Sequence, residues 1–147
     1  EIFFVDLPTR KEREEIFCIH IEKRLTSEQV KGDFEITGEL LAELASISEG
    51  FIGAEIEQAV IAGLFEAYHE QRSLKKEDIM KAIKQTVPLS VTQAEQIRAL
   101  REWANVRAVA ATLGDDRADY GKEVETEVME GISDDIHSKR GGRTIDF

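Results

Sequence analysis

Two pairs of residues have the types and spacing of ligand contacts. Ile16 and His20 lie four positions apart in the segment IFCIHI. On a helix this spacing places both side chains on one flat, mostly apolar face with one hydrogen-bonding edge. Gly53 and Ala54 open a later helical pattern, where the first backbone amides lack intrahelical partners and carry partial positive charge. Small residues there let the backbone approach an anion or a nucleotide.

Both pairs also have a plain structural explanation. A histidine on an apolar helical face is more often a satisfied core residue than a ligand contact. Gly50 and Gly53, three apart in SEGFIGAEIE, are equally explained by a tight turn before a helix. Spacing alone leaves both alternatives open.

Motifs for bond cleavage are absent from the sequence. It contains no GxxxxGK[ST] phosphate loop, no HExxH and no CxxC pair, and no spacing singles out a Ser, His and Asp set. Asp134, Asp135 and His137 could suggest a metal, but a solvated charge cluster is the better interpretation of an acidic segment. We therefore assign no catalytic residue and no metal ligand.

The charge balance limits the classes of partner. The 147 residues carry a formal net charge of −11, which disfavours nucleic acid and anionic membranes as partners. The longest apolar runs fall short of the roughly 20 residues that a membrane span requires. Cys18 is the single cysteine, so no intrachain disulfide forms, and a reducing, cytoplasmic compartment fits best.

The elements that position these residues are mainly helical, after one strand. Residues 2–5, IFFV, form an apolar run typical of a strand covered on both faces. Every later periodic segment repeats at helical spacing. We therefore expect an orphan strand whose sheet lies in a missing domain before Glu1.

Helical start signals and apolar periodicity predict a bundle. Thr9 and Glu12 form a capping box for a helix ending near Arg24. Further helices are expected over about 38–45, 54–71 and 76–85, and a second capping box, Thr92 to Glu95, starts another that ends near Gly114. The inward positions of the last helix are Ile97, Leu100, Trp103 and Ala104. The central helix has a wide apolar stripe: Ile56, Val60, Leu64 and Ala67, then Ile61, Phe65 and Tyr68.

Residues 114–147 are acidic and poor in aromatic residues. This composition predicts disorder. Val124, Val128, Ile132 and Ile136 recur every fourth residue, so a weak amphipathic helix that docks on a partner is the competing interpretation, which Gly131 disfavours.

Three segments in fixed order resemble the end of an AAA-type ATPase: EIFFVDLPTRKEREEIFCIHI, SEGFIGAEIEQAV and KKEDIMKAIKQTVP. The resemblance implies that residues 1–7 are the last strand of the α/β nucleotide-binding subdomain and 8–88 its C-terminal helical lid. An extension helix over 89–113 and an acidic tail over 114–147 follow. The continuation PLSVTQAEQIRALREWAN resembles the AAA proteins of cyanobacterial and some chloroplast genomes, which are thought to act in regulating photosynthesis or inorganic-carbon use.

The resemblance also implies roles for the two pairs. In AAA proteins the residues at the positions of Ile16 and His20 pack against adenine. The Gly-Ala pair at Gly53 and Ala54 brings the start of the central helix near the ribose and phosphates. Ile52 stands where many members carry a Ser or Thr cap, and Lys75 replaces a frequent Thr cap. Losing such a cap costs about 1 kcal/mol if nothing compensates.

The implied function is ATP binding within an ATP-hydrolysing, protein-remodelling or regulatory motor. The phosphate loop, the acidic pair that holds Mg²⁺ and the arginine fingers precede these segments in the family, so we expect the chain alone to be inactive. The intact protein would form a homo-oligomeric ring, a hexamer, acting on an unknown protein in the cytoplasm or chloroplast stroma. The alternative is a non-enzymatic, acidic helical module that binds a protein partner.

Overall fold

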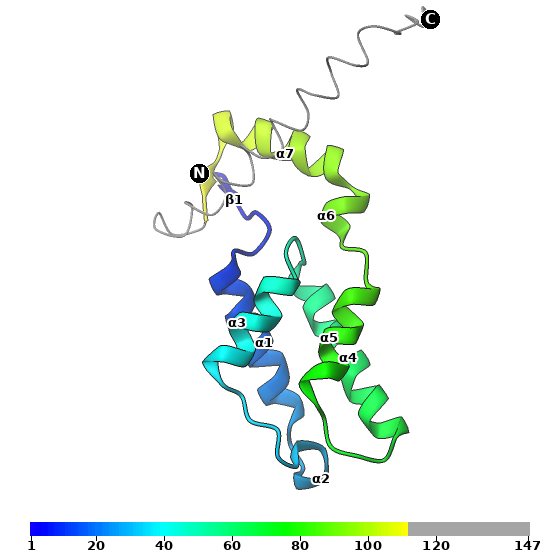
Figure 1. Ribbon diagram of the computed structural model, residues 1–147. Coiled ribbons are helices and arrows are strands. Elements are labelled where there is room, and N and C mark those ends of the chain that lie inside the picture. The colour runs from blue at the N-terminus through cyan, green and yellow to red at the C-terminus, as the bar shows by residue number, and fades with distance from the viewer. Residues whose placement is uncertain (112–147) are drawn as a thin grey trace, which may run out of the picture. The chain divides into compact units, whose positions relative to one another are not determined.

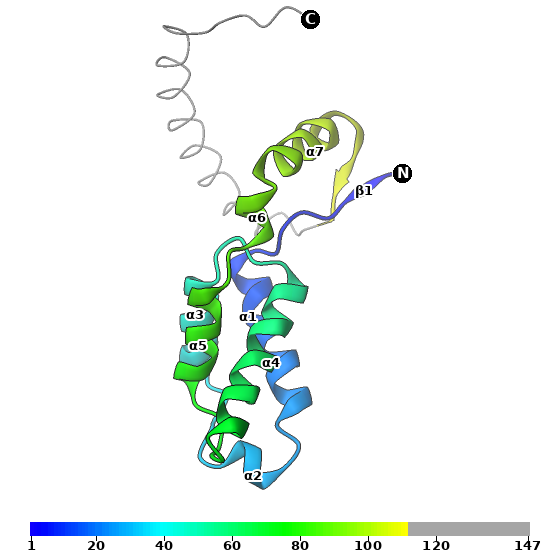
Figure 2. The same cartoon turned by 90° about the vertical axis from the view of Figure 1, so that its right-hand side faces the viewer.

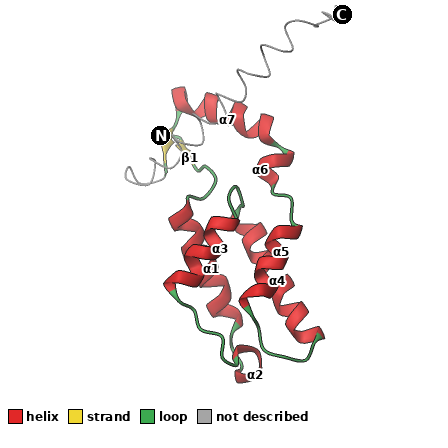
Figure 3. Ribbon diagram, viewed as in Figure 1, coloured by secondary structure: helices red, strands yellow, loops and turns green. Residues whose placement is uncertain are grey.

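Helices dominate the computed structural model, which describes residues 1–111 (Figures 1 and 3). The mainly helical class predicted from the sequence is confirmed. The expected disorder or weak helix of residues 114–147 lies outside the described residues. The elements are β1 (Phe3–Phe4), α1 (Arg10–Arg24), α2 (Glu28–Lys31), α3 (Gly38–Ile47), α4 (Gly53–His69), α5 (Lys76–Gln85), α6 (Leu89–Thr92), α7 (Ala94–Arg107) and β2 (Val109–Ala110).

The capping box predicted for α1 is present. The Thr9 hydroxyl accepts a hydrogen bond from the Glu12 amide at 3.3 Å, and the Thr9 amide donates to the Glu12 carboxylate at 2.8 Å. One residue later, the buried Arg13 donates to the carbonyl of Ala45 at 3.1 Å and to that of Pro8 at 2.9 Å. These bonds fix the start of α1 against the end of α3.

One hydrophobic core joins α1, α3, α4 and α5, which lie side by side (Figure 2). α4 packs most closely on α5, because Gly63 on α4 has no side chain to separate them. A Cβ atom at Gly63 would lie 3.0 Å from the backbone nitrogen of Ile79. The fully buried large side chains are Phe17, Ile21, Leu44, Ile56, Ile79 and Val60.

The buried carboxylate of Asp78 caps the start of α5, where the side chain of Lys75 makes no capping hydrogen bond. Asp78, 6% exposed, accepts the Lys75 amide at 2.9 Å and two bonds of 2.7 Å from the Arg72 guanidinium. These hydrogen bonds, that from Arg72 above all, lower the pKa of Asp78 below its ordinary value. The missing Thr cap at Lys75 is thus compensated by the carboxylate at the third position of the helix.

The expectation that the first strand has no partner in this chain is wrong. β1 pairs in parallel with β2, with Phe3 opposite Val109 and Phe4 opposite Ala110. The amides of Val109 and Ala111 donate to the carbonyls of Ile2 and Phe4 at 2.8 and 2.9 Å. A two-residue strand is too short to show a periodicity of its own.

The second capping box and the predicted helix end near Gly114 are also wrong. Residues 89–92 form the separate helix α6, and the Thr92 hydroxyl donates to the Leu89 carbonyl at 3.3 Å. α7 then starts after Gln93 without a side-chain cap and ends at Arg107. Because Pro88 starts a turn of its own, Thr92 closes one helix rather than opening the next.

The predicted inward faces of α4 and α7 are only partly buried. Ile56, Val60 and Ala67 are in the core, whereas Phe65 and Tyr68 are 68% and 82% exposed. On α7 Ala104 is buried, but Leu100 and Trp103 are exposed. Each helix of a bundle this small buries only one face, so an apolar stripe wider than that face leaves apolar residues in solvent.

Candidate functional site

The four predicted contact residues lie on two helices that pack together, α1 and α4. Ile16 is half-buried and packs against the core. His20, one turn further along α1, has a side chain that is 21% exposed. Phe17 and Ile21, beside them in sequence, are fully buried. The face formed by Ile16 and His20 is therefore supported by the core and partly open to solvent, as a contact for a flat ligand requires.

Two charged residues connect this face with α4. The Arg24 guanidinium lies 3.1 Å from His20 Nδ1 and 2.5 Å from the Glu57 carboxylate. The same carboxylate lies 3.8 Å from His20 Nδ1. Arg24 also donates to the His20 carbonyl at 3.2 Å. Arg24 and Glu57 thereby hold the imidazole between α1 and α4.

The contact with Arg24 constrains the tautomer of His20. A guanidinium has only donors, so Arg24 can hydrogen-bond to His20 Nδ1, 3.1 Å away, in the tautomer that carries its proton on Nε2. In that tautomer Nε2–H is a donor for an acceptor group of a ligand.

The start of α4 is held by a reciprocal carboxylate rather than by a side-chain cap. Ile52 has no side-chain acceptor, and the Glu55 carboxylate accepts its amide at 2.9 Å. Gly53 and Ala54 follow as the first helical residues, and a Cβ atom at Gly53 would meet no atom within 4 Å. The backbone at Gly53 is therefore open to approach.

Glu57 and Arg24 connect the helix that carries Gly53 and Ala54 with the helix that carries Ile16 and His20. Glu57 is four residues after Gly53, so the two share a face of α4. Arg24 is four residues after His20 and shares its face of α1. Sequence reasoning missed Arg24 and Glu57, although this repeated spacing was a signal that could have found them.

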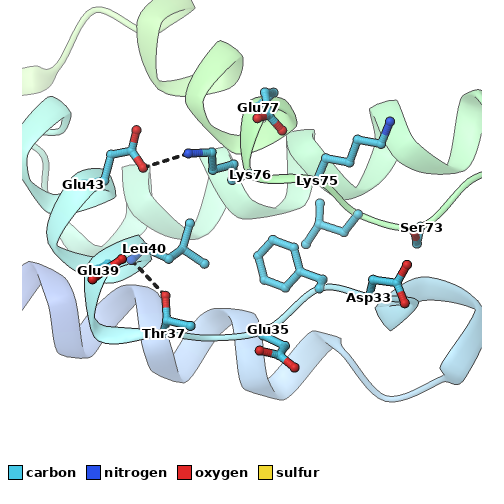
Figure 4. Close-up of a pocket in the computed structure, with 12 residues that line it drawn as sticks. Asp33, Glu35, Thr37, Glu39, Leu40, Glu43, Ser73, Lys75, Lys76 and Glu77 are labelled. Carbon is cyan, nitrogen blue, oxygen red and sulfur yellow. Dashed lines mark hydrogen bonds and ion pairs between the residues drawn. The ribbon is translucent and has the colours of Figure 1, made fainter.

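A concave surface lies elsewhere on the molecule. A groove of about 420 Å³ runs between the starts of α3 and α5, with Phe34, Leu40 and Leu74 among its walls (Figure 4). An ion pair of 3.2 Å between Lys76 and Glu43 crosses it. None of the four predicted contact residues lines this groove. The groove is therefore separate from the predicted contacts.

The described residues were also considered for a metal site and for a membrane-spanning helix. Among residues 1–111 no three His, Cys, Asp or Glu side chains are grouped so as to hold a metal ion. Asp134, Asp135 and His137 lie outside that range. Within the same range no helix has the length and apolar character needed to cross a membrane.

Comparison with known proteins identifies proteins whose sequences are similar to this chain. No family model matches it. It is 46% identical over 104 residues to the "Uncharacterized AAA domain-containing protein ycf46" of Pyropia yezoensis, and 39% identical over 105 residues to the protein of that name in Trieres chinensis. Each match covers 71% of this chain and 20% of the relative. Over these residues the chain is therefore similar to proteins named as AAA domain-containing, and it spans about one fifth of their length.

Proposed function

We propose that the helices α1 to α5 are the lid of an AAA ATPase, and that the lid contacts bound ATP and couples its turnover to motion. The observation that carries the proposal is the contact cluster of His20, Arg24 and Glu57, which joins the predicted adenine face on α1 to α4 near its first turn. The relationship to AAA domain-containing proteins supports it.

Adenine suits the face formed by Ile16 and His20. Ile16 offers an apolar surface for a flat ring, and the partly exposed His20 offers Nε2–H to a ring nitrogen. The bond from Arg24 to Nδ1 keeps the imidazole in this orientation and tautomer. The chain's own residues would thus bind and orient the base without taking part in bond cleavage.

The start of α4 suits the ribose better than a phosphate. Gly53 leaves its backbone open, and amides of a first helical turn have no intrahelical acceptor. The Glu55 carboxylate, however, accepts the Ile52 amide there and offsets the positive end of the helix. An uncharged sugar avoids the repulsion that a phosphate would meet from Glu55.

The remaining parts of the activity belong to the whole protein. ATP hydrolysis would need the phosphate loop, the carboxylates that hold Mg²⁺ and an arginine finger, none of which is in the 147 residues. Lid movement after hydrolysis would act on the next subunit of a homo-oligomeric, hexameric ring and so on a protein substrate or regulator. A chloroplast stromal location and a role linked to photosynthesis or carbon use accord with plastid-encoded relatives.

Nucleotide affinity of the full-length parent protein tests the proposed contacts. His20→Ala should weaken ATP binding about tenfold, equivalent to about 1.4 kcal/mol, because it removes one stacking surface and one donor. His69→Ala is the matched control, since His69 is an exposed histidine at the end of α4. Equal affinities of the two variants and the unmodified protein would remove the support for the site.

A second candidate function has an observation of its own. Phe65 and Tyr68 lie about one turn apart on α4 and are largely exposed. Exposed aromatic residues are enriched at protein interfaces. This favours the alternative of an acidic helical module that binds a protein partner. A variant with Phe65→Ser and Tyr68→Ser should then lose partner binding.

A further inference from the structure

Residues 89–111, which we call the strap, connect the two sides of a hinge. The hinge is formed by Leu7 and Pro8, which follow Asp6 and precede the Thr9 cap of α1. The strap comprises α6, α7 and β2, and it follows directly on the helical bundle. Its first residues contact the bundle, and its last residues contact β1. We propose that the strap sets the angle between β1 and the bundle.

The first anchor lies next to the start of α4. The Leu89 amide donates to the Glu55 carboxylate at 2.7 Å, and this carboxylate also accepts the Ile52 amide. Ser90 packs on Gly50, where a Cβ atom would lie 2.3 Å from the Ser90 hydroxyl. Gly50 has a φ of +75°, which suits glycine. The strap is therefore fixed to the loop that precedes Gly53.

The second anchor lies on the strand side of the hinge. Arg101 Nε donates to the Asp6 carboxylate, at 2.9 and 3.0 Å from its two oxygens. Both side chains are mostly buried, with 19% and 16% exposed. The same carboxylate accepts the Leu7 amide at 2.7 Å. A partly desolvated pair with a further hydrogen bond is held more firmly than a surface ion pair.

The paired strands extend this anchor to the far end of the strap. Val109 and Ala111 donate to Ile2 and Phe4. A parallel pair this short is marginal alone, so its persistence depends on the ion pair that brings α7 to β1. The chain thus closes a loop from β1 through the bundle and back to β1.

A closed loop of this kind restricts the hinge. β1 cannot rotate against the bundle unless the Asp6–Arg101 pair, the paired strands or the Leu89–Glu55 bond breaks. In the isolated chain the strap would hold the hinge at one angle. An effect of the strap on nucleotide turnover rests on the proposed function, because the hinge angle controls activity only if the bundle is a lid over bound ATP. Release of the strap would then free the lid to move.

Solvent exchange of the Val109 and Ala111 amides, measured by NMR on the full chain, tests the second anchor. Arg101→Ala should speed their exchange about fivefold or more while the amide of the buried Val60 is unaffected. Arg98→Ala is the matched control, an exposed arginine one turn earlier on α7. The exchanged pair Asp6→Arg with Arg101→Asp should restore slow exchange, which a general loss of folding would not allow. Equal exchange in all variants, or amides unprotected in the unmodified chain, would overturn the strap.

The hinge itself is tested by the distance between spin labels. Labels at Val5→Cys and Ala62→Cys, both exposed, are placed in a Cys18→Ser background. We expect a narrow distance distribution for the unmodified strap and for Arg98→Ala, and a broad one for Arg101→Ala. Equal widths in all three would contradict the inference. No nucleotide is present, so this result is independent of whether ATP binds to His20.

Discussion

Glu57 on α4 accepts a hydrogen bond from Arg24 on α1, and the same guanidinium contacts His20. This relationship joins two helices whose contact residues were predicted separately. It also explains how a partly exposed imidazole keeps one orientation.

Replacing Glu57 should disturb the site more than the fold. Glu57→Ala removes a partly exposed ion pair, which costs about 0.2–1 kcal/mol of the free energy of unfolding. It also frees Arg24 and so leaves His20 less ordered, which should weaken nucleotide binding by the parent protein. Chemical denaturation and nucleotide titration measure the two effects. Glu22→Ala, on an exposed position of α1, is the control. A large loss of stability without a change in affinity would contradict the assigned role.

Asp78 should make the stability of the bundle sensitive to acid. Arg72 lowers its pKa in the folded state, so the folded chain binds this proton more weakly than the unfolded chain. The contribution is complete at pH values above the unfolded pKa of about 4 and is lost as the pH falls through the lower folded pKa. Asp78→Ala should cost about 1–3 kcal/mol near neutral pH and flatten the acid limb of the stability curve.

Denaturation at pH values between neutral and strongly acidic checks the role of Asp78. Glu66→Gln is the comparison, because Glu66 pairs with Lys81 at the surface and should change little. An acid limb unchanged by Asp78→Ala would show that the Arg72 pair does not stabilise the fold.

Two glycine substitutions should act in opposite directions. Gly63→Ala gains about 1 kcal/mol of helix propensity, but its methyl group would meet the backbone of Ile79 at 3.0 Å, and overpacking costs about 1–3 kcal/mol. Gly38→Ala meets no atom within 4 Å at the start of α3 and should stabilise by about 0.4–1 kcal/mol. Thermal unfolding measures both. Stabilisation by Gly63→Ala would mean that α4 and α5 pack less closely than described.

The open side of β1 should promote self-association. Val5 is 77% exposed and Phe3 is 63% exposed, and β2 covers one edge of β1. An uncovered apolar strand edge is a template for pairing with another chain. Light scattering should show concentration-dependent association that Phe3→Lys with Val5→Lys abolishes. If Phe65→Lys on α4 abolishes it instead, the apolar residues of α4 are responsible and the prediction for β1 is wrong.

Local signals allowed much of the bundle to be predicted. α5 has the predicted bounds, Lys76–Gln85, and the Thr9 capping box starts α1 as expected. Both depend on residues within one or two turns, where capping and periodicity act. Ile52 lacks a side-chain cap as expected, and Glu55 supplies the compensating bond.

Contacts between distant residues could not be predicted in this way. β2 has two residues and exists because α7 returns to β1, with Arg101 reaching Asp6 from 95 positions away. The bond from Leu89 to Glu55 likewise depends on the path after Pro88. For the site, sequence spacing predicted the two residue pairs, whereas the connection through Arg24 and Glu57 required the packing of α1 on α4.

Photocrosslinking with 8-azido-ATP tests the central proposal most directly, because the reactive group is on the adenine ring. The full-length parent protein is labelled, digested and mapped by mass spectrometry. We expect the label on the peptide of α1 that contains Ile16 and His20, and we expect excess ATP to suppress it. A label that excess ATP suppresses but that is confined to peptides outside α1 and the start of α4 would contradict the proposed adenine contact.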